Sequence, residues 1–312
     1  MTLLISHPSF LEHDTGDYHP ERPDRLRAVM AALADEEFAG LRRLMAPEAT
    51  IEQLTRVHPR EYVDAILDIQ PPPGELVHID ADTVMSAGSA NAARHAAGAV
   101  VAAVAGVLEG RARNAFAAVR PPGHHATPDV PGGFCLFNNV AIGARHAQAA
   151  FDVERVAIID FDVHHGQGTQ AVVELEPTLF YASTHQYPLY PGTGFVRDRG
   201  IAGNVANVPL AAGAGSLEFR TAWGERLLPA LDGFAPELVI VSAGFDAHRR
   251  DPLAGLEVET EDFVWLTEEL LAVADRHAQG HLVSVLEGGY DLAALAESVS
   301  THVRALMAAD AA

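Results

Sequence analysis

The sequence predicts an α/β fold in which one domain, residues 1–312, holds a mainly parallel sheet flanked by helices. The first observation is a set of short apolar runs rich in β-branched residues. Both faces of these runs are apolar, as in parallel strands that are covered on each side. The second observation is that segments with helical spacing lie between the runs, and such alternation is typical of parallel sheets. The predicted strands cover residues 114–119, 155–160, 178–183, 238–244 and 281–289.

The predicted helices cover residues 22–33, 96–108, 216–231 and 259–278. The first places Pro23 in its first turn, where a missing amide N–H breaks no helical hydrogen bond. The second is an Ala/Val-rich run that stops at Glu109, short of the ~20 residues that a membrane helix needs, so we expect a buried helix. The last two carry apolar residues three and four positions apart. Residues 70–75 are expected to form a surface loop, and no linker divides the chain.

Composition narrows the classes of function. The chain is 48% hydrophobic and 20% charged, as ordinary globular proteins are. Its formal charge of −21 disfavours nucleic-acid binding and favours cationic partners, although solubility explains the charge equally well. Lysine is absent, which excludes Schiff-base catalysis and the lysine of a phosphate-binding loop. The chemistry is therefore expected to depend on Asp, Glu, His, Tyr, Ser or a metal.

The single cysteine and the start of the chain predict the location of the protein. Cys135 alone cannot form a disulfide framework or a Cys-rich zinc cluster, which fits a reducing compartment. The first residues, MTLLISHPSF, have no basic start, and their apolar run is too short for a secretory signal. We therefore expect a cytoplasmic protein without membrane or nucleic-acid partners.

Polar side chains follow four of the predicted strands. RPPGHHA follows the first of these strands, DFDVHHG the second, GFDAH the third and EGGYD the fourth. In open parallel sheets, ligands bind outside the carboxyl ends of the strands. The sequence therefore predicts a site at one edge of the sheet, built from His, Asp and Tyr side chains.

Two aspartates and a histidine alternate after one of these strands. Alternate side chains of an extended segment face the same way, so Asp160, Asp162 and His164 share a face, with backbones ~6.6 Å apart. Two of them can close on one ion, and Asp246 is the best candidate for a third ligand of Zn²⁺. A divalent ion would also cancel the charge of two buried carboxylates. The alternative is that Asp162 caps a loop and the histidines are ordinary core residues.

The motifs together resemble the zinc-dependent histone deacetylase superfamily, which includes acetylpolyamine amidohydrolases and acetoin-utilisation proteins. The resemblance covers about residues 5–295 and rests on RPPGHHA, GGFCLFNNVAIGA, DFDVHHGQGTQ, YPGTG, SAGFDAH with DPL, and LEGGYD. HPERPDRL and DADTVMSAGS look closer to the class II branch and its bacterial relatives. The resemblance implies a single-domain, three-layer fold of the arginase and deacetylase type.

The resemblance also implies roles in hydrolysis. Zn²⁺ held by Asp162, His164 and Asp246 would polarise the carbonyl of an acetyl amide and acidify a water. The general base would be His125. The supporting groups would be His124 beside it, Asp160 orienting His124, and Tyr290 donating to the oxyanion.

Gln167 is the position that would pair with His125, and many relatives carry Asp or Asn there. A neutral amide would keep His125 unprotonated near neutral pH, as a base should be. The alternative is that Gln167 is an ordinary loop residue.

Further positions follow from the same resemblance. The acyl-lysine channel is expected from Gly133, Phe134, Tyr190 and Leu253, with Asp82 at its rim and Arg22 along an acetate exit. Phe134 and Tyr190 alone would be read as core, and Asp82 and Arg22 as surface charges. K⁺ or Na⁺ is expected at two backbone sites, the first formed by Asp160, Asp162, His164, Ser183 and Thr184 and the second by Val173, Glu176, Leu179 and Asn204.

Three functions are compatible with these residues. The first is hydrolysis of acetyl-lysine in proteins or peptides, and the second is hydrolysis of small cationic amides such as acetylpolyamines. Leu253 stands where polyamine-selective members carry an acid, so it favours the first. The third, disfavoured by Tyr290, is a silent binder of acyl-lysine. The sequence leaves the physiological substrate, the acyl length and an assembly of identical subunits open, and its Ala-rich, lysine-free composition hints at a bacterial source.

Overall fold

The computed structural model describes residues 1–309 and confirms the predicted α/β fold. A central sheet has eight strands in the order β2-β1-β5-β10-β9-β6-β7-β8, and every pair is parallel. Its strands are β1 (Thr2–Ser6), β2 (Arg42–Met45), β5 (Asn114–Ala117), β6 (Val156–Asp160), β7 (Leu179–Gln186), β8 (Val205–Leu210), β9 (Leu238–Ala243) and β10 (Leu282–Leu286). A short antiparallel pair, β3 (Val77–His78) and β4 (Val84–Met85), stands apart.

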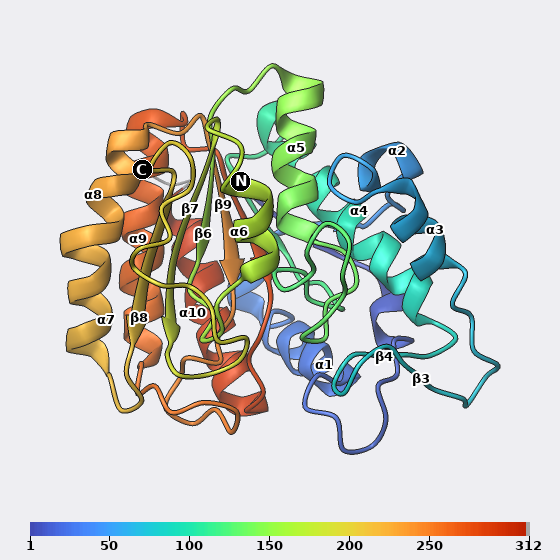
Figure 1. Ribbon diagram of the computed structural model, residues 1–312. Helices are drawn as coiled ribbons and strands as arrows, with labels where there is room; N and C mark the ends of the chain where they lie inside the picture. Colours follow the sequence, from blue (N-terminus) through green and yellow to red (C-terminus); the bar gives the residue numbers. More distant parts are fainter. Residues whose placement is uncertain (310–312) are drawn as a thin grey trace.

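Helices cover both faces of the sheet and complete three layers (Figure 1). One face packs against α4 and α5, and the other against α9 and α10, with α1 lying on α10. The helices are α1 (Pro23–Ala32), α2 (Ile51–Leu54), α3 (Arg60–Leu67), α4 (Ser89–Leu108), α5 (Asn139–Phe151), α6 (Gln167–Val173), α7 (Ser216–Ala222), α8 (Leu228–Phe234), α9 (Thr260–His277) and α10 (Leu292–Ala308). The main core fills the spaces between the sheet and these two layers.

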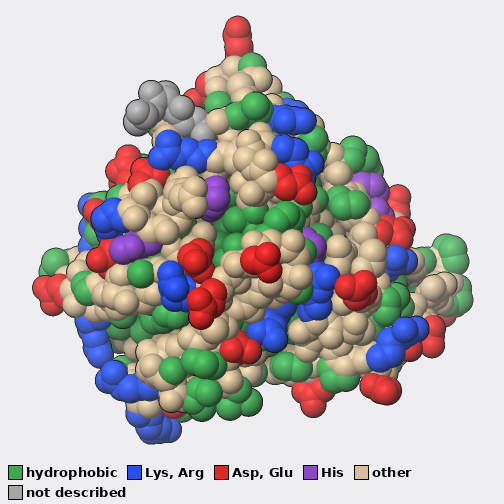
Figure 2. Space-filling view, turned by 90° about the horizontal axis from the view of Figure 1, so that it is seen from above, with side chains coloured by type: hydrophobic (Ala, Val, Ile, Leu, Met, Phe, Trp, Pro, Cys, Tyr) green, Lys and Arg blue, Asp and Glu red, His purple; other side chains and the backbone are tan. Residues whose placement is uncertain are grey.

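The order of the strands explains why distant motifs can meet. The four strands that precede the predicted site motifs, β5, β10, β9 and β6, are direct neighbours in the middle of the sheet. Their carboxyl ends point to the lower side of Figure 1. Figure 2 shows the opposite side of the molecule from above, where acidic and arginine side chains are interspersed.

Three strands at the sheet margins were not predicted from the sequence. β1 lies at the start of the chain, β2 is a short edge strand with mostly exposed residues, and β8 contains Pro209. β2 and β8 each have one partner in the sheet, and edge strands tolerate proline. β1 is buried and pairs with both β2 and β5, so an edge position does not explain why it was missed. The apolar runs revealed the buried strands β5, β6, β7, β9 and β10.

The predicted helix over 216–231 is interrupted. α7 ends at Ala222, a π-helical turn spans Trp223–Leu227, and α8 begins at Leu228. Pro229 lies at the start of α8, and proline has no amide N–H to bond to the preceding turn. A wider π turn accommodates this loss, and it also lets the Trp223 indole donate to the Thr184 hydroxyl at 3.1 Å.

The predicted buried helix is α4, which begins at Ser89, earlier than expected. Of the helices in residues 1–309, α4 alone is long and apolar enough by length and composition to cross a membrane. It packs against α5, β1, β5 and β10 in the core, as the central helix of a folded domain does.

Buried neutral histidines predict acid-sensitive stability. Burial lowers the pKa of His302 from 6.5 to about 3 and that of His58 from 6.5 to about 4. Protons then bind the unfolded chain more readily than the folded one, so the stability present above pH 6.5 is lost as the pH falls toward the folded-state pKa values. Each histidine should contribute a slope of roughly 1.4 kcal/mol per pH unit within that window. Calorimetry between pH 8 and pH 5 should show a falling Tm, and His302→Gln should flatten the fall whatever its effect at pH 8.

Candidate active site

Three predicted metal ligands meet in the structure. Asp162 and His164 follow β6 and Asp246 follows β9, the neighbouring strand. One ligand atom from each lies within 4.8 Å of the others, and all three side chains are buried. His164 Nδ1 is 3.1 Å from Asp162 Oδ1 and 3.2 Å from Asp246 Oδ2. A carboxylate, an imidazole and a second carboxylate around one point form a donor set suited to a divalent cation.

The charges of this cluster also fit a cation. Burial and the charge of Asp162 raise the pKa of Asp246 to about 6. Burial alone would lower the pKa of His164, but the two carboxylates outweigh burial and raise it to about 10. The pair of buried carboxylates therefore attracts positive charge strongly, and a divalent ion supplies that charge.

Backbone groups hold the carboxylates in place. The amide of Gly288 donates to Asp162 Oδ2 at 2.9 Å, and the amide of Val163 donates to Asp246 Oδ1 at 2.9 Å. A Cβ atom on Gly288 would lie 2.0 Å from an oxygen of Asp246, so only glycine allows this close approach. The glycines of EGGYD thus bring the loop after β10 against the ligands.

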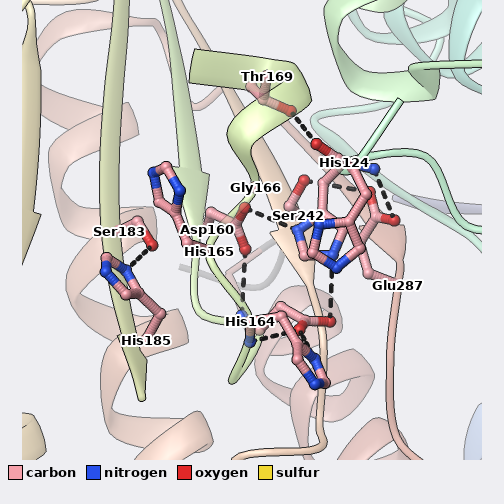
Figure 3. Close-up of polar contacts among 12 residues, drawn as sticks. His124, Asp160, His164, His165, Gly166, Thr169, Ser183, His185, Ser242 and Glu287 are labelled. Carbon is pink, nitrogen blue, oxygen red and sulfur yellow. Dashed lines mark hydrogen bonds and ion pairs between the residues drawn. The ribbon is translucent and has the colours of Figure 1, made fainter. Parts of the chain in front are cut away.

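His124 lies between two buried acids, as Figure 3 shows. Its Nδ1 donates to Asp160 Oδ2 at 3.0 Å, and its backbone amide donates to Glu287 at 3.3 Å. Burial alone would lower the pKa of His124, yet Asp160 and Asp162 raise it to about 10. His124 is therefore cationic at neutral pH and keeps a fixed orientation.

Two groups that the sequence analysis gave no role hold this arrangement. The Tyr181 hydroxyl donates to Asp160 Oδ2 at 2.9 Å. Glu287 accepts from the Gly123 amide at 2.7 Å and from the Ser242 hydroxyl at 3.1 Å. Figure 3 shows Ser242 of β9 and Glu287, which directly follows the neighbouring strand β10, beside His124. The LEGGYD motif could have indicated this role for Glu287. A carboxylate at the end of a buried strand is itself buried and therefore needs hydrogen-bond donors around it.

His125 differs from His124 in its partner. Its Nδ1 lies 2.7 Å from Gln167 Oε1, while Gln167 Nε2 donates to the His125 carbonyl at 3.2 Å. The second bond fixes which end of the amide is the acceptor, so Nδ1 of His125 carries a proton and Nε2 is free to accept one. Burial and the positive charges of His124 and His164 hold the pKa of His125 well below 6.5.

Tyr290 lies beside the ligand cluster at the end of EGGYD. Burial and the charge of Asp246 raise the pKa of its hydroxyl well above 10, so it stays a proton donor. The Phe134 ring meets it edge-on with centroids 5.9 Å apart, and the Arg25 guanidinium lies 4.9 Å from the ring centroid. The phenol therefore has a defined position next to the carboxylates.

Arg22, which was expected along an acetate exit, lies elsewhere in the structure. The Arg22 side chain is 42% exposed and lies 3.7 Å from Asp24, outside the site. Arg25, one turn further along α1, is buried and donates to the carbonyls of Glu287 and Gly289. Arg22 precedes Pro23 as the residue that caps α1, so it faces solvent, whereas Arg25 faces the sheet.

Arg25 belongs to a buried ionic network that the sequence did not reveal. Glu21 Oε1 accepts from Arg25 at 2.9 Å, and Arg120 donates to both oxygens of Glu21. The two guanidinium groups outweigh burial and hold the pKa of Glu21 well below its usual range. The network anchors the loop that carries Tyr290, because Arg25 binds both Glu21 and the loop carbonyls.

Gly133, Phe134 and Tyr190 surround the approach to His125. The Tyr190 ring meets His125 edge-on with centroids 5.0 Å apart. Gly133 has φ +54°, and a Cβ there would lie 2.4 Å from the His125 ring, so the backbone itself forms the wall. These residues stand beside the His125 ring, where the resemblance places the acyl-lysine channel, called the passage below.

An acidic turn borders this passage. The Asp80 carboxylate and the Tyr190 hydroxyl each lie 3.4 Å from the point where a Cβ on Gly132 would stand. Asp82 is half-buried next to Asp80, and its carbonyl bonds to Nε2 of His19, whose ring meets Phe134. Asp82 and Asp80 are therefore two acids in the neighbourhood of Phe134 and Tyr190.

Leu253 is partly buried, and the carboxylate of Asp251 connects its backbone amide to that of Tyr290. Asp251 accepts from the Leu253 amide at 3.0 Å and from the Tyr290 amide at 2.7 Å. The loop after β9 and the loop after β10 are therefore joined at the passage.

Asp251→Asn is expected to lower kcat for amide hydrolysis roughly tenfold with a smaller change in KM, because one of two charge-assisted bonds is lost and Tyr290 moves. Steady-state kinetics with a hydroxamate-binding assay tests this. Asp291→Asn is the matched control, since Asp291 caps α10 and its carboxylate does not bond to the Tyr290 amide. Equal losses in both variants would show a general effect of charge.

The residues of the two predicted monovalent-cation sites also lie close together. Asp160 and Ser183 are in register between β6 and β7, next to Thr184. At the second site, the carbonyls of Val173, Glu176 and Leu179 all lie 2.8–3.0 Å from the single amide nitrogen of Asn204. These three carbonyls are thus hydrogen-bonded to the Asn204 side chain, whose amide nitrogen occupies the point on which they converge.

Comparison with known proteins places the chain in a family. The histone deacetylase domain matches residues 19–306. A histone deacetylase-like amidohydrolase of Pseudomonas aeruginosa is 40% identical over 87% of this chain and 72% of that protein. A probable deacetylase of Archaeoglobus fulgidus is 37% identical over 94% of this chain and 82% of that protein.

A solved structure agrees with these matches. The crystal structure of the HDA15 HD domain superposes with a TM-score of 0.92 at 36% identity, covering 98% of this chain and 88% of that chain. The fold, the family match across most of the chain and the buried acid and histidine cluster agree with the resemblance that the motifs indicated. This chain belongs to the histone deacetylase family.

Proposed function

We propose that this protein is a zinc-dependent deacetylase that hydrolyses the amide of N-acetyl-lysine in proteins or peptides to lysine and acetate. Membership of the histone deacetylase family supports hydrolysis of an amide bond. The observation that carries the finer proposal is the meeting of Asp162, His164 and Asp246 beside a paired imidazole and a phenol. Zinc held by these three ligands supplies a Lewis acid that polarises the acetyl carbonyl and makes water more acidic.

The chain's own residues divide the proton transfers. His125 accepts a proton from water at its free Nε2, because Gln167 holds the proton on Nδ1. His124 stays cationic through Asp160 and supplies positive charge next to the reacting atoms. Tyr290 donates from its hydroxyl to the oxygen that gains charge, and burial together with the charge of Asp246 raises its pKa and keeps that phenol protonated. The lysine amine receives its proton from His125 as the amide breaks.

The passage suits the aliphatic stem of an acylated lysine. Phe134 and Tyr190 are aromatic walls, and Leu253 adds an apolar side chain. The acids at the rim favour a second candidate, the hydrolysis of small cationic amides such as acetylpolyamines. Asp80 and Asp82 lie next to Tyr190, where a cationic amine of a short substrate would sit.

A substrate panel distinguishes the two candidates. Zinc-loaded full-length protein should hydrolyse an acetyl-lysine peptide with a higher kcat/KM than N-acetylspermidine, with one equivalent of zinc per chain. The reverse order would favour the polyamine candidate. A zinc-replete protein that turns over neither substrate, yet binds an acetyl-lysine peptide, would instead be a silent binder.

Other parts of the proposal complete this picture. We propose that K⁺ or Na⁺ binds at the backbone sites beside Ser183 and Asn204. We also propose that the protein is a class II-like bacterial member of the family, that it is cytoplasmic, and that residues 1–312 form one domain. The partners would be acetylated lysines or small cationic amides rather than nucleic acid or membranes. The number of subunits can be measured by sedimentation on the same zinc-loaded sample.

A further inference from the structure

An apolar cavity of about 490 Å³ lies at the edge of the sheet, apart from the catalytic residues. Leu4 of β1, Leu26 and Met30 of α1, and Leu44 and Met45 of β2 supply most of its wall. Its size falls within the range of about 300–1,000 Å³ that is typical of small-molecule sites. Met45 is 64% exposed, whereas Leu4 and Leu26 are buried, so the cavity opens to solvent beside Met45 and ends in the core.

Basic groups stand at the opening of this cavity. Arg27 is neutralised by Asp24 at 2.7 Å. Arg43 is exposed and donates to the carbonyl of Leu33, and in the described part of the chain it has no carboxylate partner. An exposed guanidinium without a carboxylate partner among the described residues therefore lines an apolar cavity, in a chain whose formal charge is −21.

A histidine adds a second polar group to the wall. His7 Nδ1 lies 2.7 Å from the Ser9 hydroxyl, and the His7 ring stacks on His95 with centroids 3.8 Å apart. The ring is therefore fixed by its neighbours, while its Nε2 makes no hydrogen bond to the residues that the structure describes. The cavity thus offers an apolar interior with a guanidinium and an imidazole nitrogen.

We propose that this cavity binds an unbranched aliphatic carboxylate of medium chain length. The chain would fill the space between α1 and β2, and the carboxylate would accept from the Arg43 guanidinium, which matches its geometry. The wall selects for chain length because each added methylene buries more apolar surface. The guanidinium selects for a carboxylate over an alcohol or an amine of equal length.

Calorimetric titration of sodium decanoate into the full-length protein tests this site. A saturating hydroxamate keeps the ligand out of the catalytic passage. We expect one decanoate per chain, octanoate binding roughly fifteenfold more weakly, and no binding of decylamine. Arg43→Gln should weaken decanoate at least about tenfold, because a charge-assisted bond is lost. Arg42→Gln is the matched control, since Arg42 is the exposed neighbour on β2 and does not line the cavity.

Met45→Glu gives an independent test that does not disturb the core. Met45 is exposed, so the variant should fold, and its carboxylate should repel decanoate from the opening. The proposal is overturned if decanoate does not bind, if Arg43→Gln and Met45→Glu bind as the unmodified protein does, or if decylamine binds equally well. Decanoate that binds only without the hydroxamate would occupy the catalytic passage, which also overturns it.

Discussion

Replacing His125 by Ala is expected to lower kcat for amide hydrolysis by roughly 100- to 10,000-fold, the range that loss of a positioned general base produces. The structure makes His125 the better base of the two histidines. Asp160 and Asp162 keep His124 protonated, with a pKa of about 10, so His124 has no site for another proton. Burial and the charge of His124 lower the pKa of His125, so its Nε2 is free near neutral pH.

The measurement is kcat on an acetyl-lysine peptide, together with zinc content and hydroxamate affinity, which His125→Ala should leave nearly unchanged. Gln167→Glu is the informative companion variant. A carboxylate beside Nδ1 would raise the pKa of His125 and so shift the acidic limb of the pH–rate profile upward. If His125→Ala lowers kcat by less than roughly tenfold, the base is another group and the division of roles between the two histidines is wrong.

The cluster of acids and histidines at this edge of the sheet was predictable because its residues lie in sequence-local motifs. Asp162 and His164 are two residues apart after a buried strand, and the parallel order of β6 and β9 brings Asp246 to them. The apolar pattern shows that each motif directly follows a strand. In a parallel sheet the carboxyl ends of neighbouring strands lie at the same edge, so the motifs come together there. Neither inference needs the coordinates of any side chain.

The residues that hold this edge could not be predicted in the same way. Arg25 and Arg22 are both arginines in the first turns of one helix, and only the packing of α1 decides which one is buried. Glu21 and Arg120 are 99 residues apart, and nothing local marks them as partners. Long-range ion pairs depend on which faces of helices and loops meet, and that information is spread over the whole chain.

Replacing Tyr290 by Phe is expected to lower kcat roughly 100- to 1,000-fold, as loss of one oxyanion donor does. The substitution removes only the hydroxyl. The Phe134 ring and the Arg25 guanidinium would still hold the aromatic side chain, so the loop should keep its shape. KM should change much less than kcat, because the hydroxyl is needed where negative charge develops rather than in substrate binding.

The Arg25→Gln variant separates the role of the Tyr290 hydroxyl from that of the guanidinium that holds its loop. This variant keeps the phenol but removes the guanidinium that binds the carbonyls of Glu287 and Gly289, so the position of Tyr290 should become less defined. Its loss of kcat should be smaller than that of Tyr290→Phe. The double variant should lose little more kcat than Tyr290→Phe alone, because the effects of two substitutions that act through one group do not add. Losses that multiply in the double variant would show that Arg25 acts independently of the phenol. Full activity of Tyr290→Phe, with zinc bound, would remove the phenol from the proposed reaction and leave zinc and His124 as the sources of positive charge at the oxyanion.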